Sequence, residues 1–132
     1  MYIQSLENFS DERGYLYPLE FDRLPFTPKR VFMVCDVPKG ETRGEHAHYE
    51  TEQFLICLKG KIDVILFDGD KDVKISLSPV QGVHVPKLVW DSQIFNTGDD
   101  MLLVLASTDY DREDYIESYS TFKALKERRK DL

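Results

Sequence analysis

The fold of this chain is indicated most directly by one stretch, Arg43-Gly44-Glu45-His46-Ala47-His48, which Glu52-Gln53 follows closely. Two of the chain's three histidines lie in it. Because successive side chains of a strand point to opposite faces, His46 and His48 project the same way and Ala47 points elsewhere. Two neighbouring imidazoles can hold a metal ion or transfer protons, so we expect the chemistry of the protein here.

Composition predicts an ordinary folded domain. Of the 132 residues, 42% are hydrophobic and 31% are charged, and we expect residues 1–132 to form a single domain. The first residues show no apolar segment of an export signal, and no run is long enough to span a membrane. Cys35 and Cys57 lie in apolar runs without a Cys-x-x-Cys motif, which predicts two buried thiols in a cytoplasmic protein.

The charge balance narrows the possible partners. The chain has 17 basic and 24 acidic residues, a net charge of −7, which opposes general binding to nucleic acid. A small phosphorylated ligand is still compatible, because a local arginine cluster can bind a diphosphate. Arg13, Arg30 and Arg43 fall in the N-terminal third and are candidates for that role.

Short strands dominate the rest of the pattern. Buried or alternating runs predict strands at residues 15–21, 30–37, 54–58, 62–67, 73–77, 83–85, 89–95 and 101–106. Lys59-Gly60-Lys61 is expected to close a tight hairpin between two of them. Many short antiparallel strands predict an all-β sandwich or barrel. Residues 109–130 differ, since apolar residues recur there at three- and four-residue steps and predict short C-terminal helices.

The spacing around the histidines resembles the first motif of the cupin barrels, in which two histidines and a glutamate usually bind a metal. Its residues here are Gly40, His46, His48, Glu52 and Gly60. The second cupin motif is incomplete, because Leu88 stands in place of its glycine and Asp91 in place of its histidine. One alternative is therefore a metal-dependent cupin enzyme with His46, His48 and either Glu52 or Asp91 as ligands.

Further short motifs along the chain resemble those of the sugar 3,4-ketoisomerases, a WxcM-like cupin family. They are Asp11-Glu12-Arg13-Gly14, Lys29-Arg30-Val31, Arg43 to His48, Glu52-Gln53, Val89-Trp90, Leu103 to Ser107 and Asp114-Tyr115-Ile116. The resemblance implies a cupin-type jelly roll and a homodimer with exchanged N-terminal strands. It also implies that neither a metal nor a cofactor is required.

Enzymes of that family act on a 4-keto-6-deoxyglucose linked to thymidine diphosphate (TDP). The resemblance therefore implies a TDP-3-keto-6-deoxyhexose as product, made for 3-amino-3,6-dideoxyhexoses of lipopolysaccharide or another surface glycan. An aminotransferase is expected to act next. The configuration at C4 of the product, gluco or galacto, stays open.

The reaction itself suits histidine. Moving a ketone from C4 to C3 needs a base that takes the C3 proton and an acid that protonates C4 of the enediol, and the pKa of imidazole lies near working pH. His46 and His48 are the candidates, with His46 favoured as the base and the other or the same residue as the acid. Arg43 is expected near the sugar or the pyrophosphate, and by resemblance Arg13 and Arg30 are expected near the nucleotide.

Two further residues are candidates for binding. Gln53 can orient the sugar if a turn near residues 49–51 reverses the strand parity, and Trp90 can stack on the sugar or thymine.

The chain departs from many relatives at Phe32, where they carry a tyrosine. A non-catalytic sugar-binding cupin is the other alternative, and a 3,5-epimerase is conceivable.

Overall fold

The computed structural model describes residues 1–130, most of whose regular structure is strand. The strands are β1 (Gln4–Ser5), β2 (Phe9–Asp11), β3 (Gly14–Leu16), β4 (Arg30–Cys35), β5 (Thr42–His48), β6 (Gln53–Lys59), β7 (Ile62–Phe67), β8 (Asp72–Leu77), β9 (Gln81–Val85), β10 (Trp90–Phe95), β11 (Met101–Ala106) and β12 (Tyr115–Ile116). The helical elements are the 3₁₀ turns η1 (Phe21–Arg23) and η2 (Arg112–Asp114) and the helix α1 (Tyr119–Lys130). The last two residues of the predicted domain, 131 and 132, lie outside this description.

Two five-stranded antiparallel sheets face each other. Their strand orders are β1-β9-β6-β11-β4 and β12-β5-β10-β7-β8. Alternation along β7 buries Ile62, Val64 and Leu66 completely between the sheets, and each such side chain contributes about 1.5–3 kcal/mol. The predicted all-β jelly-roll architecture is confirmed, as a sandwich and not as a closed barrel.

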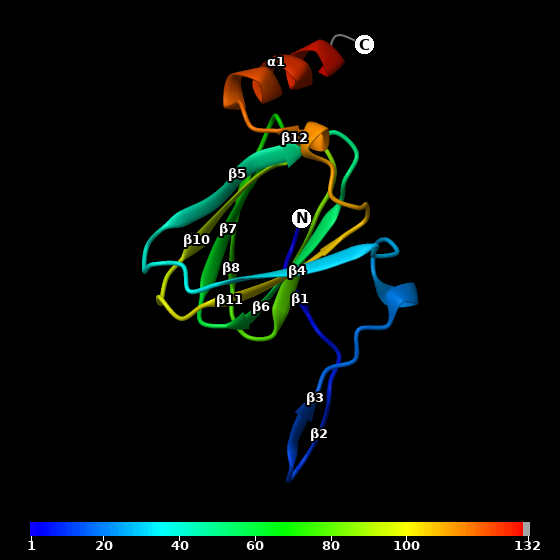
Figure 1. Cartoon of the computed structure of the whole chain (residues 1–132), viewed down its shortest axis with the longest axis vertical. Helices are drawn as coiled ribbons and strands as arrows, with labels where there is room; N and C mark the ends of the chain where they lie inside the picture. The colour runs from blue at the N-terminus through cyan, green and yellow to red at the C-terminus, as the bar shows by residue number, and fades with distance from the viewer. Residues whose placement is uncertain (131–132) are drawn as a thin grey trace.

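Two elements extend from opposite ends of this sandwich (Figure 1). One is α1, which packs on the outer side of the β12-containing sheet through Phe122. The other is the hairpin β2–β3, which projects away from the body with Phe9, Tyr15 and Leu16 more than 60% exposed. Among residues 1–130, no helix is long and apolar enough to cross a membrane.

The C-terminal prediction was wrong in its first half. The only helical element in residues 109–118 is the short turn η2. The next two residues, Tyr115 and Ile116, form a strand and pair with His48 and Ala47 of β5. Tertiary pairing outweighs the helical spacing here. The helix α1 begins after Ser118, whose Oγ accepts a hydrogen bond from the Thr121 backbone N–H at 3.2 Å.

Three local predictions also fail. The turn at Gly60 is no hairpin, because β6 and β7 belong to different sheets. The alternating run at residues 15–21 leaves the strand after Leu16 and enters η1. Cys57 is buried as predicted, but Cys35 is exposed because β4 is an edge strand whose outer face is uncovered.

Candidate active site

A pocket of about 200 Å³ opens between the two sheets and gathers polar side chains from both of them. Its walls come from β4, β5, β6, β10, β11 and β12. The lining residues are Arg30, Phe32, Val34, Arg43, Gly44, His46, Gln53, Gln93, Val104 and Tyr115. The predicted candidates His46, Arg43, Arg30 and Gln53 therefore meet in one cavity.

A β-bulge brings Arg43 and His46 to the same face of β5. Arg43 lies opposite Gln93 and His46 lies opposite Asp91, so Glu45 is an extra residue on this strand. Without it, side chains three positions apart would point to opposite faces. Gly44 and Glu45 both have positive φ, 81° and 58°, and a Cβ at Gly44 would lie 3.0 Å from the Asp91 carbonyl oxygen. Glycine is thus required where the bulge forms.

The two histidines lie side by side, and Tyr115 packs against both. The ring centroids of His46 and His48 are 4.9 Å apart, and the Tyr115 ring lies 5.2 Å from His46 and 4.4 Å from His48. His46 lines the pocket, whereas His48 is 5% exposed and lies behind it. The Nε2 atom of His46 is buried without a hydrogen-bond partner.

Burial keeps both imidazoles neutral. It lowers the pKa of His46, an effect that the hydrogen bond to the Gly44 backbone partly offsets. It lowers the pKa of His48 to about 4, and the neighbouring His46 acts in the same direction. A neutral imidazole in the wall of the pocket whose Nε2 has no hydrogen-bond partner is suited to accept a proton.

Asp91 and Gln93 form a buried polar pair on β10 beside this site. The Gln93 Nε2 donates to Asp91 Oδ2 at 2.7 Å, while Asp91 Oδ1 has no partner. Asp91 is 1% exposed, and burial raises its pKa to about 7, although the hydrogen bond from Gln93 opposes the shift. Of the two, Gln93 reaches the pocket.

The turn after β5 decides which side chain of the Glu52-Gln53 pair faces the pocket. Gln53 points inward and is 4% exposed. Glu52 lies on the other side of the sheet, where its Oε1 is 2.8 Å from His84 Nε2. The cupin ligand set of His46, His48 and Glu52 is therefore not assembled. No group of three potential metal-binding side chains, including one with Asp91, occurs among residues 1–130.

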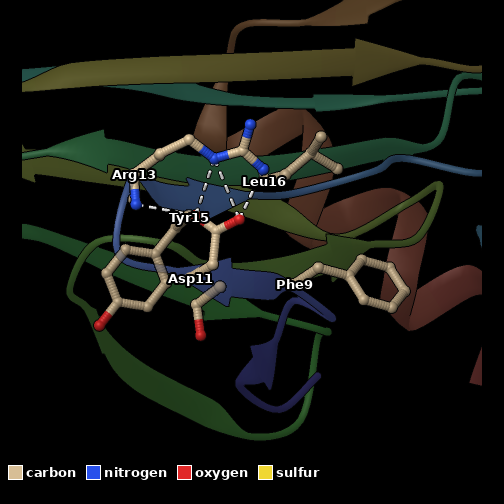
Figure 2. Close-up of a pocket in the computed structure, with 7 residues that line it drawn as sticks. Phe9, Asp11, Arg13, Tyr15 and Leu16 are labelled. Atoms are coloured by element: carbon tan, nitrogen blue, oxygen red, sulfur yellow. Dashed lines mark hydrogen bonds and ion pairs between the residues drawn. The ribbon is translucent and has the colours of Figure 1, made fainter.

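The three arginines occupy different places. Arg30 lines the pocket, with its guanidinium carbon 4.6 Å from the centre of the Phe32 ring and 5.1 Å from that of Tyr110. Arg43 lines the same pocket from β5. Arg13 lies on the projecting hairpin, along a separate cavity of about 450 Å³, and its Nη2 is 2.7 Å from Asp11 Oδ2 (Figure 2).

Trp90 does not line this pocket. Alternation along β10 turns Asp91 and Gln93 inward and Trp90 outward, where its ring lies 5.1 Å from Tyr119 and 5.7 Å from Phe122 of α1. We therefore assign Trp90 to packing and revise the expectation that it stacks on a ligand.

Sequence reasoning missed Gln93 and Tyr115 as residues of the pocket. The alternation of β10 could have indicated Gln93. For Tyr115, the family motif Asp114-Tyr115-Ile116 could have indicated a role in the site. The helical spacing of the apolar residues there concealed the strand that places it.

A jelly-roll sandwich with a histidine-containing polar pocket is a cupin-type protein, and comparison with known proteins defines the group. The family described as "FdtA: WxcM-like, C-terminal" matches residues 1–127, and the chain belongs to it. The TDP-4-oxo-6-deoxy-alpha-D-glucose-3,4-oxoisomerase of Aneurinibacillus thermoaerophilus is 43% identical over 123 residues, 92% of this chain and 88% of that protein.

Solved structures agree with this assignment. QdtA, a sugar 3,4-ketoisomerase from Thermoanaerobacterium thermosaccharolyticum in complex with TDP, superposes with a TM-score of 0.90 at 36% identity, over 96% of this chain and 94% of that one. The WlaRB TDP-quinovose 3,4-ketoisomerase from Campylobacter jejuni gives a TM-score of 0.87 at 38% identity, over 92% and 95% of the two chains.

Proposed function

We propose that this protein is an isomerase that converts TDP-4-keto-6-deoxyglucose to a TDP-3-keto-6-deoxyhexose, with His46 as the base. The observation that carries the proposal is the neutral imidazole of His46 in the pocket, with Nε2 free to accept a proton. Identity above 30% to relatives named as 3,4-ketoisomerases, over nearly the whole chain, supports the substrate class.

The reaction needs two proton transfers on adjacent carbons. His46 takes the C3 proton, which the C4 carbonyl acidifies, and an enediol forms between C3 and C4. The C4 oxygen takes up the proton that the C3 hydroxyl gives up, the C3 oxygen becomes the new carbonyl, and His46 returns its proton to C4. General acid–base catalysis of this kind contributes about 10²–10⁴ in rate.

The other pocket residues hold the sugar and its charge. Arg43 is the cation on the strand of His46, so it stabilises the enediolate or the adjoining phosphate. Gln53, Gln93 and Arg30 line the pocket, which supports roles for the two glutamines in binding sugar hydroxyls and for Arg30 in binding the nucleotide. His48 supports His46 from behind, since it is buried and in ring contact with it.

Neither a metal nor a cofactor takes part in this proposal. Glu52 pairs with His84 and lies away from His46 and His48, which argues against the cupin metal set. We expect enzyme treated with a chelator to convert the TDP-linked 4-keto sugar to its 3-keto isomer, as followed by proton NMR. His46→Asn should lower kcat by about 10²–10⁴, and His48→Asn should retain measurable turnover.

Two outcomes would contradict this mechanism. One is loss of activity with the chelator and recovery with a divalent metal, which favours a metal-dependent cupin. The other is tight binding of the nucleotide sugar without conversion, which favours a sugar-binding domain.

The functional unit we propose is a homodimer that exchanges its N-terminal hairpin. The exposed apolar residues Phe9 and Leu16 of the hairpin match Val31 and Met33, which are 58% and 57% exposed on the edge strand β4. A partner's hairpin lying along β4 would cover both surfaces and close an open sheet edge. Arg13 would then reach the nucleotide in the partner's pocket.

The small size of the pocket supports a contribution from a second chain. Its volume of about 200 Å³ is below the roughly 300–1,000 Å³ of most ligand sites, which suits the sugar but not the whole nucleotide.

We further propose that the enzyme works in the cytoplasm, a reducing compartment in which the free thiols Cys35 and Cys57 are stable.

A further inference from the structure

The residues from Tyr110 to Ile116, here called the strap, are tied to the chain that follows the two histidines. The Asp114 carboxylate accepts hydrogen bonds from the backbone N–H groups of Glu50 at 2.9 Å and Thr51 at 3.0 Å, and from the Thr51 hydroxyl. The Asp114 carbonyl accepts another from the Tyr49 N–H at 3.0 Å. The strap is therefore fixed relative to the end of β5.

This attachment sets the position of one aromatic ring. Tyr115 lies directly opposite His48 in the pairing of β12 with β5, and the next pair is Ile116 with Ala47, both buried. The Tyr115 ring meets His48 at an interplanar angle of 60° and His46 at 66°, and it also lines the pocket. One side chain thus borders the sugar cavity and both imidazoles.

We propose that Tyr115 is a positioning residue of this enzyme, whose ring closes one wall of the sugar pocket and holds His46 and His48 edge-to-face, away from water. The inference deepens the proposed ketoisomerase function and rests on it for its kinetic readout. The ring and not the hydroxyl carries the role, because the ring makes the contacts to both imidazoles. Edge-to-face contacts of this kind stabilise the rings beyond the area that they bury.

The ring also explains how the imidazoles stay dry. Desolvation is the leading cause of the low pKa of both histidines. The charged groups that act on them are few: Asp114 and Arg30 influence His48 in opposite directions, and Glu117 influences His46. Asp91 faces His46 from β10. Removing the ring admits water while these charges stay in place, so the histidine pKa values should rise.

The test compares Tyr115→Phe with Tyr115→Ala. We expect Tyr115→Phe to keep kcat and KM near the wild-type values, since the ring is retained. We expect Tyr115→Ala to lower kcat about tenfold or more, up to the roughly 10²–10⁴ that general acid–base catalysis contributes. In NMR titrations of the ligand-free protein, the pKa of His48 should rise from about 4 toward its ordinary value of 6.5 in Tyr115→Ala alone.

Tyr49→Ala is the matched control, because this tyrosine is next to His48 in sequence, is 40% exposed and does not line the pocket. It should leave the His48 titration unchanged. If Tyr115→Ala does not fold, Tyr115→Val takes its place, since a β-branched residue suits strand β12. The titration needs no substrate, so it decides the role of Tyr115 even if the wild-type protein fails to isomerise the sugar.

Two results would overturn the inference. A His48 titration that stays near the wild-type value in Tyr115→Ala would show that the ring does not shield the pair. A loss of kcat in Tyr115→Phe as large as in Tyr115→Ala would transfer the role from the ring to the hydroxyl.

Discussion

At the scale of single residues, Asp91 is the most unusual group of the site. It stands where a cupin metal ligand is expected, yet it is buried without a cation, and one of its oxygens has no partner. A carboxyl in such surroundings favours its neutral form. It is therefore a source of pH dependence in the stability of the fold.

The pKa of Asp91 is raised to about 7 in the folded state, from 3.8 in the absence of burial. The folded protein keeps a proton that the unfolded chain releases, so this contribution to stability is complete below about pH 4 and is lost as pH rises through 7. Asp91→Asn has no such proton. We expect its stability relative to wild type to increase from pH 5 to pH 8 by on the order of a few kcal/mol.

Urea unfolding at the two pH values measures this difference. The exposed Asp109→Asn variant is the control and should show no comparable change. An Asp91→Asn variant that differs from wild type by the same amount at pH 5 and pH 8 would contradict the assignment of a neutral Asp91.

At the scale of elements, the bulge in β5 determines whether Arg43 and His46 can act on one substrate. Gly44→Ala combines a strained φ of +81° with a Cβ only 3.0 Å from the Asp91 carbonyl oxygen. We expect a loss of stability on the order of 1–3 kcal/mol and a raised KM, because Arg43 shifts relative to His46.

Gly40→Ala is a close control, since Gly40 has a φ of +86° and nothing within 4 Å of an added Cβ. It carries the strain without the contact, so it should lose some stability but keep the wild-type KM. Equal kinetic effects of the two substitutions would mean that the contact at Gly44 does not set the geometry of the pocket.

The elements also show what the sequence could reveal. The strands β7 and β11 were predicted residue for residue, because alternation and buried apolar runs are local signals. The direction of the Gln53 side chain, which points into the pocket, was not predictable, since it depends on how residues 49–51 turn. The crossover at Gly60 looks like a hairpin in sequence, because a three-residue turn does not reveal which sheet receives the next strand.

The site was predictable to a similar extent. The pair His46 and His48 is a local pattern, and its position followed from strand parity. The contact of Tyr115 with the two histidines joins positions far apart in the chain. The face of β5 on which Arg43 lies depends on a bulge that the alternation of residues does not reveal. Such long-range and irregular features have no local signature.

At the scale of the whole molecule, the proposed exchange of hairpins predicts complementation between two defective variants. Arg13→Ala and His46→Asn should each have little activity alone. If every site combines its own His46 with the partner's Arg13, one site in four is intact in a randomly formed mixture of the two variants. We expect activity to recover to about a quarter of wild type after subunit exchange.

Co-expressed chains with two different affinity tags allow the mixed dimer to be purified and assayed directly. If Arg13 serves the pocket of its own chain, each mixed dimer has two defective sites and no activity returns. A monomer in sedimentation experiments would also contradict the exchange.

The proton transfer by His46 between C3 and C4 of the sugar is tested most directly by proton NMR of TDP-4-keto-6-deoxyglucose incubated in D₂O with chelator-treated enzyme. We expect a 3-keto product that carries deuterium at C4, and with His46→Asn we expect product and label to form about 10²–10⁴ times more slowly. Isomerisation by His46→Asn at a rate near that of the wild type, or substrate that returns unchanged and unlabelled from the wild-type enzyme, would contradict this role of His46.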